Sequence, residues 1–181
     1  MSDLIPPHGG FRTLRSFIVG QQIYDATVIF CNRFIDKRSR TNDQMVQAAR
    51  SGVQNIAEGS LASATSKKTE LKLTSVARAS LGELQLDYED YLRQRCKKQW
   101  DKNSAEALKV RKELSDKSDQ SDKPDWLSLT DDVFANTLIC LINQASFLLW
   151  KQMQRLEEDF IKEGGFTERL YTVRKAARAK P

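Results

Sequence analysis

Basic side chains gather in three short stretches of the sequence, and their type and spacing could do chemistry. Lysine and arginine bind phosphate groups and release the counterions that surround a nucleic acid. The first, second and third basic stretches are Arg33, Lys37, Arg38 and Arg40; Arg93, Arg95, Lys97 and Lys98; and Arg169, Arg174, Lys175 and Arg178. Trp100 follows the second stretch and could stack on an unpaired base. Together these residues predict a surface that binds RNA or DNA.

A second explanation is that the three stretches are solvated helix ends. Basic side chains are favoured in the last turn of a helix, where they face the negative end of its dipole. The third stretch is also amphipathic, so it could dock on RNA or on a neighbouring subunit. Spacing alone leaves these alternatives open.

Catalytic and metal chemistry has no comparable support in the sequence. The chain has a single histidine, His8, and so lacks the histidines of a catalytic triad or a zinc site. Glu157, Glu158 and Asp159 are consecutive, and on a helix they would point in different directions. The sequence also lacks the glycine-rich motifs that cradle nucleotide phosphates. We therefore expect no catalytic residue, no metal site, no cofactor and no enzymatic activity.

Composition predicts a soluble cytoplasmic protein. The 181 residues suffice for one domain with a substantial core. A net charge of +5 and a pI of about 9.1 favour polyanionic partners. Cys31, Cys96 and Cys140 stand far apart without a CxxC pair, which is typical of a reducing compartment. We expect no signal peptide and no membrane contact, because no apolar run reaches the roughly 20 residues that span a bilayer.

The elements that must position these residues are helices. Apolar residues recur at helical spacing over residues 14–35, 41–59, 66–97 and 130–163, and over a short tail after residue 164. We expect Thr41, through a capping box with Gln44, to begin the second helix and Gly59 to end it. In the tail, one helical face is formed by Phe166, Leu170, Val173 and Ala177.

Four such stripes with short or moderate connections predict an all-α fold, an antiparallel up-down-up-down four-helix bundle with a short C-terminal helical tail. Residues 1–10 are expected to be a disordered leader, residues 11–163 the bundle and residues 164–181 the tail. In an antiparallel bundle the ends of the first and third helices lie at the same pole. The first two basic stretches could therefore combine there.

Two helices carry apolar residues outside their main stripes. Ile23, Phe30 and Phe34 form a second set on the first helix, and the third helix adds Leu73, Val76 and Leu86. Exposed apolar patches usually mark partners, so these residues predict self-association. A wide stripe in a tightly packed bundle is the alternative.

Three strings resemble one family. Residues 44–60 read QMVQAARSGVQNIAEGS, residues 77–84 read ARASLGEL, and residues 157–171 read EEDFIKEGGFTERLY. The first two resemble signatures of the four-helix bundle proteins, also called 23S ribosomal RNA intervening-sequence proteins, and the third resembles the extension of their suffix branch. The chain departs from many members at Val53, where they have proline, so its second helix should continue without a kink.

The resemblance implies an antiparallel four-helix bundle that assembles into a homopentameric ring with a basic surface. One relative is the accessory protein of diversity-generating retroelements, which works with a reverse transcriptase and its template RNA. The resemblance also picks out the motif residues Asn55, Glu58, Gly59, Arg78, Ser80 and Glu83. Their polar side chains could form a shared ligand or partner site. The alternative is a bridge between Glu58 and Arg78 that fixes helix register, with Asn55 capping or bridging.

These observations favour a non-enzymatic, homo-oligomeric scaffold or accessory protein, expected to be a pentamer, that binds RNA or DNA through its basic stretches. A nucleic-acid enzyme such as a reverse transcriptase is a second possible partner. The alternative is a protein–protein adaptor without nucleic-acid contact. Salt distinguishes the two, because only nucleic-acid binding weakens steeply as salt rises.

Overall fold

The computed structural model describes residues 9–116 and 125–178, and over these residues the protein is all-helical without strands. A 3-10 helix, η1 (Phe11–Thr13), precedes the α-helices. These are α1 (Arg15–Phe34), α2 (Arg40–Ala62), α3 (Lys67–Gln94), α4 (Ala105–Asp116), α5 (Asp131–Glu163) and α6 (Phe166–Arg178). Residues 1–8 of the expected leader and residues 117–124, where we expected a loop, lie outside the described residues.

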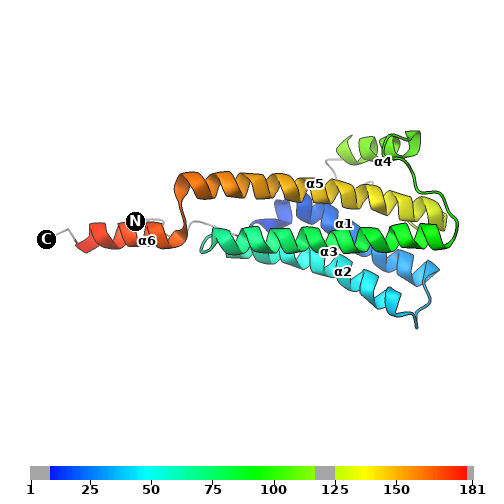
Figure 1. Ribbon diagram of the computed structural model, residues 1–181, viewed down its shortest axis with the longest axis horizontal. Coiled ribbons are helices and arrows are strands. Elements are labelled where there is room, and N and C mark those ends of the chain that lie inside the picture. Colours follow the sequence, from blue (N-terminus) through cyan, green and yellow to red (C-terminus); the bar gives the residue numbers. More distant parts are fainter. Residues whose placement is uncertain (1–8, 117–124, 179–181) are drawn as a thin grey trace.

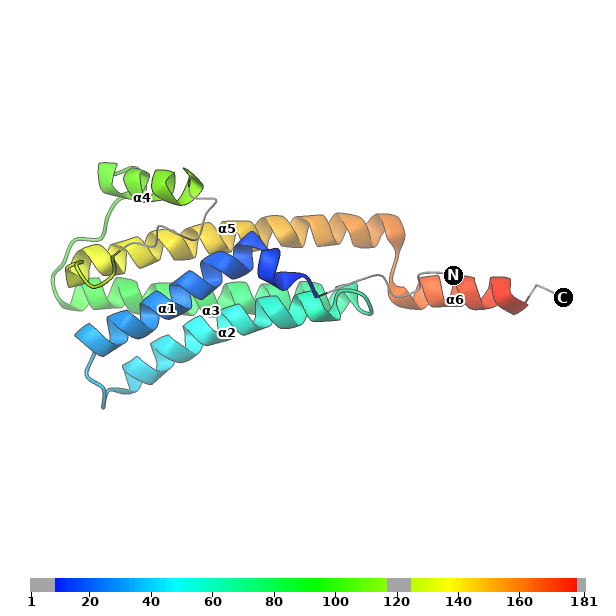
Figure 2. The same ribbon diagram turned by 180° about the vertical axis from the view of Figure 1, so that it is seen from behind.

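Four of the helices contact one another extensively. Helix α2 packs on α3, α3 packs on α5, and α1 packs on both α2 and α5 (Figure 1). Helix α4 contacts the outer side of α5. Helix α6 projects away from the other helices in both views (Figure 2).

Local chemistry explains where the helices begin and end. Ser39 caps α2, since its side chain accepts a hydrogen bond from the backbone N–H of Thr41 at 3.2 Å. The expected capping box at Thr41 is therefore wrong. Ser66 caps α3 through the N–H of Thr69 at 3.1 Å. Gly164, with a φ of 69°, ends α5 as expected.

Gly59 does not end α2, which continues to Ala62. It is buried against the start of α3, where an added Cβ atom would lie 3.4 Å from the carbonyl oxygen of Glu70. An added methyl group would therefore touch the backbone of α3, which shows that the two helices approach closely here. The third helix also ends earlier than expected, at Gln94, and α4 is a separate helix.

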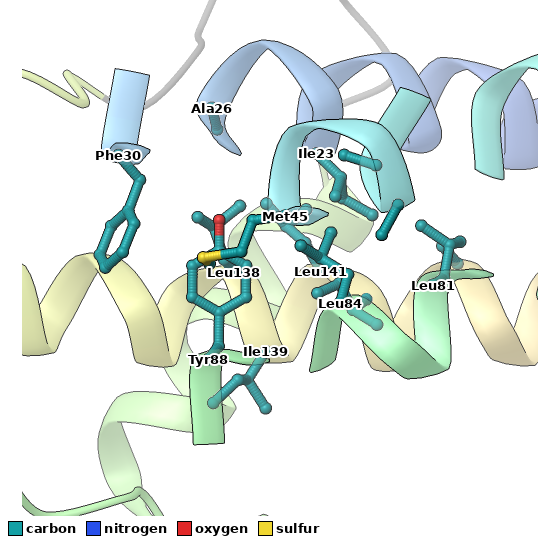
Figure 3. Packing of buried hydrophobic residues seen from close by; sticks show 14 of the residues in the cluster. Ile23, Ala26, Phe30, Met45, Leu81, Leu84, Tyr88, Leu138, Ile139 and Leu141 are labelled. Atoms are coloured by element: carbon teal, nitrogen blue, oxygen red, sulfur yellow. The ribbon is translucent and has the colours of Figure 1, made fainter. Parts of the chain in front are cut away.

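Aromatic rings form the centre of the core at one end of the molecule. The ring of Phe30 lies edge-on to those of Tyr88, Tyr91 and Phe134, with centroids 4.9 to 5.5 Å apart. The hydroxyl of Tyr88 is buried and donates to the hydroxyl of Thr27 at 3.0 Å, which joins α3 to α1. Figure 3 shows Phe30 and Tyr88 pointing into the interior.

The apolar face of α1 is wider than the predicted main stripe. Ile23 and Phe30, which we assigned to a second set, are fully buried, whereas Tyr24 beside them is only partly buried. The reason is that α1 packs on two neighbours, α2 and α5. For these two residues the prediction of an exposed self-association surface is wrong. On α3, by contrast, Val76 and Leu86 are 38% and 63% exposed.

One helical stretch of the described residues is long and apolar enough to cross a membrane by length and composition. It begins with α5 at Asp131, and 56% of its most apolar window is buried inside the protein. Such burial is consistent with the core helix of a soluble protein.

Candidate nucleic-acid interface

The first basic stretch lies at the end of α1 and the start of α2. Two guanidinium nitrogens of Arg33 donate hydrogen bonds to the carbonyl oxygens of Trp126 at 2.6 Å and Leu129 at 3.1 Å. Its guanidinium also lies 4.5 Å from the centroid of the Phe34 ring. Arg33 therefore fastens the segment before α5 to α1, and these contacts use two of the five N–H donors of its guanidinium.

The second basic stretch lies at the end of α3, and three of its four cations have partners in the chain. Lys97 donates to a carboxylate oxygen of Asp131 at 2.7 Å. Arg93 pairs with Asp90 at 2.7 Å. The guanidinium of Arg95 lies 3.8 Å from the centroid of the Tyr91 ring, and the Arg95 residue is exposed.

The first two stretches lie at the same end of the molecule. Arg33 contacts residues just before α5, and Lys97 contacts the first residue of α5. Figure 1 shows the end of α3 and the connection from α1 to α2 at this end. We call it the basic end, defined by residues 33–40 and 93–102.

Within the basic end, four exposed cations form no ion pair, side-chain hydrogen bond or ring contact with the described residues. They are Lys37, Arg40, Lys98 and Lys102. Arg38 lies 3.8 Å from Asp36, but both side chains are highly exposed, so this pair leaves Arg38 accessible. These five side chains are the ones that the structure leaves available to phosphate groups.

Trp100 is held at the basic end by its backbone. Its N–H donates to the side-chain oxygen of Asn136 at 2.8 Å, and the side-chain amide of Asn136 donates to the carbonyl oxygen of Lys98 at 3.0 Å. The indole is partly exposed, so stacking on a base would use only part of the ring. The sequence analysis did not identify Asn136. The only indication of its role in the sequence is a polar amide among the apolar residues of α5.

The third basic stretch lies on α6, at the opposite end of the molecule from the first two (Figure 1). Arg174, Lys175 and Arg178 are exposed, and Arg169 is partly buried. Within one chain this stretch cannot share a binding surface with the basic end.

The motif residues are only partly brought together. The hydroxyl groups of Ser51 and Ser80 are 3.0 Å apart and join α2 to α3. The side-chain amide of Asn55 donates to the carbonyl oxygen of Ser51 at 2.9 Å. Glu58 and Arg78 are both exposed and do not pair, so the expected bridge between them is wrong.

The contact between α2 and α3 depends instead on small residues. An added Cβ atom at Gly52 would lie 2.9 Å from a methyl carbon of Leu81, so the two helices approach closely there. An open polar groove of about 410 Å³ follows this contact, and Arg40, Asp43, Ser80 and Glu83 are among its lining residues. Of the motif residues, Ser80 and Glu83 share this groove.

The thiols are poor candidates for nucleophiles. Burial, with a smaller contribution from Asp87, raises the pKa of Cys31 to about 12, and burial also raises the pKa of Cys140. In residues 9–116 and 125–178 no three His, Cys, Asp or Glu side chains are placed to hold a metal ion. His8 lies outside these residues.

An exposed aromatic pair on α5 was not predicted. The side chains of Phe147 and Trp150 are 55% and 39% exposed, and their ring centroids are 5.8 Å apart. The ammonium group of Lys151 lies 4.9 Å from the centroid of the Trp150 ring.

No protein-family model, curated protein or solved structure matches the chain. The resemblance of residues 44–60, 77–84 and 157–171 to four-helix bundle proteins therefore stays a prediction.

Proposed function

We propose that the protein is a non-enzymatic, homo-oligomeric scaffold of the cytoplasm that binds RNA or DNA at its basic end. The observation that carries this proposal is the convergence of the first two basic stretches beside the start of α5. Five copies would form a ring, as the resemblance implies, and would repeat the basic end around it. Such repetition increases affinity for a polyanion without any new contact.

The proposal includes an antiparallel four-helix bundle built from α1, α2, α3 and α5, with α6 as its tail. Contacts at both ends of α1 support it. Ser16 donates to the side chain of Gln152 at 3.2 Å, late in α5, whereas Arg33 donates to Leu129, just before α5. Helices α1 and α5 would therefore run in opposite directions.

Binding at the basic end would depend on the cations that have no internal partner. Each phosphate that is neutralised by Lys37, Arg40 or Lys98 would release a condensed counterion. Arg33, Arg93 and Lys97 would contribute less, because contacts within the chain already hold them.

The test is fluorescence anisotropy of labelled structured RNA and duplex DNA with a charge-reversal variant. Lys37→Glu, Arg40→Glu and Lys98→Glu together should weaken binding to every sequence by about tenfold or more at low salt. Unchanged affinity in this variant, with the fold intact by circular dichroism, would remove the basic end as the binding surface.

A matched control separates local from overall charge. Arg50→Glu, Lys68→Glu and Arg155→Glu change the net charge equally but lie outside the basic end on exposed helix surfaces. This control should bind nearly as well as the unaltered protein. Equal weakening by both variants would mean that the chain binds through net charge alone.

The exposed pair of Phe147 and Trp150 favours a second candidate, an adaptor that docks another protein, such as a nucleic-acid enzyme, through apolar contacts. Adaptor binding would persist at high salt, and Trp150→Ala would abolish it. A loss of nucleic-acid affinity with rising salt, together with an unaffected Trp150→Ala variant, supports the scaffold.

A further inference from the structure

The outer side of α3 combines exposed apolar residues with carboxylates. Val76, Glu83, Leu86 and Asp87 recur at spacings of three, four and seven residues, which place them on one side of the helix. We call these four residues the acidic face of α3. Val76 and Leu86 are exposed and do not belong to the hydrophobic core.

The carboxylates of this face are not paired with a cation of the described residues, and the cation that lines the same groove as Glu83 is Arg40. Glu83 and Asp87 form no ion pair with any described residue, and Asp90 beside them is already paired with Arg93. Burial raises the pKa of Asp87, and the neighbouring charges of Glu83 and Asp90 raise it further. A cation supplied from outside the chain would relieve this repulsion.

Helix α6 has the complementary character. None of its side chains is buried, and Phe166, Leu170, Val173 and Ala177 form an apolar row along it. Beside that row stand the exposed cations Arg174, Lys175 and Arg178. Both views show the helix projecting away from the rest of the chain (Figures 1 and 2).

We propose that α6 of one copy docks on the acidic face of α3 of a second copy. This inference rests on the homo-oligomer of the proposed function and names the contact that builds it. The apolar row of α6 covers Val76 and Leu86. The cations Arg174, Lys175 and Arg178 of α6 pair with Glu83 and Asp87.

The spacing of the two surfaces matches in one direction only. Phe166 and Ala177 are eleven positions apart, and Val76 and Leu86 are ten. When the helices are parallel and Phe166 lies beside Val76, the cations of the last turns of α6 fall beside Glu83 and Asp87. The reverse direction would place the same cations near Lys72, which repels them.

The tail of the same chain does not reach this surface. At 1.5 Å per residue, a folded-back α6 places Arg178 about 18 Å along the bundle, whereas Glu83 and Asp87 lie about 24 and 30 Å from the first residue of α3. Figure 1 shows that α5 ends beyond the start of α3, which adds to the distance. A second copy is therefore the source of the tail.

A nucleic acid does not fit the acidic face, because carboxylates repel phosphates. The docking surface and the tail are different surfaces, so each copy offers one of each to its neighbours. Contacts of this head-to-tail kind close into rings when the rotation between copies permits it.

The test is the mass of the full chain in solution, measured by light scattering after size exclusion. Arg174→Glu with Lys175→Glu should shift the protein from oligomer to monomer, and Glu83→Lys with Asp87→Lys should do the same. All four substitutions in one chain restore opposite charges across the contact and should restore the oligomer. Circular dichroism checks that each variant is folded.

The outcomes separate this inference from the proposed function. An oligomer whose mass is unchanged by both charge reversals would overturn the docking of α6 but leave the scaffold intact. The pairing would also be overturned if both double variants were folded monomers and the fourfold variant did not restore the oligomer. A monomeric unaltered protein would overturn the oligomer of the proposed function itself, whereas nucleic-acid affinity at the basic end is read separately by anisotropy.

Discussion

The ammonium group of Lys97 lies 2.7 Å from the carboxylate of Asp131, the first residue of α5. The hydroxyl of Tyr91 donates to the other oxygen of the same carboxylate at 2.9 Å. Asp131 thus receives two donors from the end of α3 at the positive end of the α5 dipole. A cation that the sequence marked for phosphate binding is held in place by the fold, whereas Lys98 beside it is exposed and forms no ion pair with the described residues.

This difference predicts distinct effects for two neighbouring lysines. Lys98→Gln should lower nucleic-acid affinity and reduce the salt slope by about one, since one phosphate contact is lost. Lys97→Gln should lower the melting temperature and change the salt slope less. Anisotropy at several salt concentrations measures the salt slope, and thermal denaturation measures the melting temperature. If the two variants changed both quantities equally, the separate roles of Lys97 and Lys98 would be contradicted.

The stability of the protein should depend on pH in opposite directions through Glu70 and Asp131. Burial raises the pKa of Glu70, partly offset by Lys67, and one of its carboxylate oxygens has no hydrogen-bond partner among the described residues. The protonated carboxyl of Glu70 therefore stabilises the folded protein. This stability is fully present below the pKa of Glu70 in the unfolded chain and is lost as pH rises through its pKa in the folded protein. The unaltered protein should therefore gain stability relative to Glu70→Gln as pH falls from neutral to about 4.

Asp131 provides the opposite case. Burial opposes ionisation, but the hydrogen bonds from Lys97 and Tyr91 together lower its pKa. Its contribution to stability is present above the unfolded pKa and is lost as pH falls through the folded pKa. The cost of Asp131→Asn should thus shrink on acidification. Urea unfolding at neutral pH and at about pH 4 measures both variants, and slopes of the same sign would contradict the prediction.

The close approach of α2 and α3 predicts a contrast between two glycines. Gly52→Ala forces a Cβ atom against the fully buried Leu81 and should destabilise the protein by about 1–3 kcal/mol. Gly82→Ala, with no atom within 4 Å of the added Cβ, should stabilise α3 by about 0.5–1 kcal/mol. Urea unfolding measures both free energies. An unchanged free energy of unfolding in Gly52→Ala would show that the two helices separate easily.

The buried hydrogen bond between Tyr88 and Thr27 should couple α3 to α1. Tyr88→Phe leaves the ring in place and removes only the hydroxyl, which should cost about 1 kcal/mol of the free energy of unfolding. In a double-mutant cycle with Thr27→Val, a coupling energy of about 0.5–1.5 kcal/mol is expected. A coupling near zero would mean that the bond does not fix the contact of the two helices.

Much of the helical content follows from the sequence because it depends on local periodicity and breakers. The ends of α5 at Thr130 and Gly164 are examples, since acidic residues follow the first and a positive φ suits the second. The role of Gly59 depends instead on how closely α3 approaches it, which no local pattern encodes. For the same reason the width of the buried face of α1 required knowledge of its two neighbours.

The candidate site was predictable in its residue types but not in its accessibility. Basic stretches are visible in the sequence, and their joint position follows from helix connectivity. Which cations remain available depends on partners distant along the chain, as with Arg33 and Leu129 or Lys97 and Asp131. Sequence spacing carries no information on such pairs.

Salt dependence is the property that most clearly distinguishes nucleic-acid binding at the basic end from apolar docking. Fluorescence anisotropy of the unaltered full chain with labelled structured RNA and duplex DNA should show affinity that falls steeply with salt. Engagement of Lys37, Arg40 and Lys98 predicts a slope of log K against log salt of about −3 for each basic end in contact. No binding at low salt, or affinity that does not change with salt, would contradict the account.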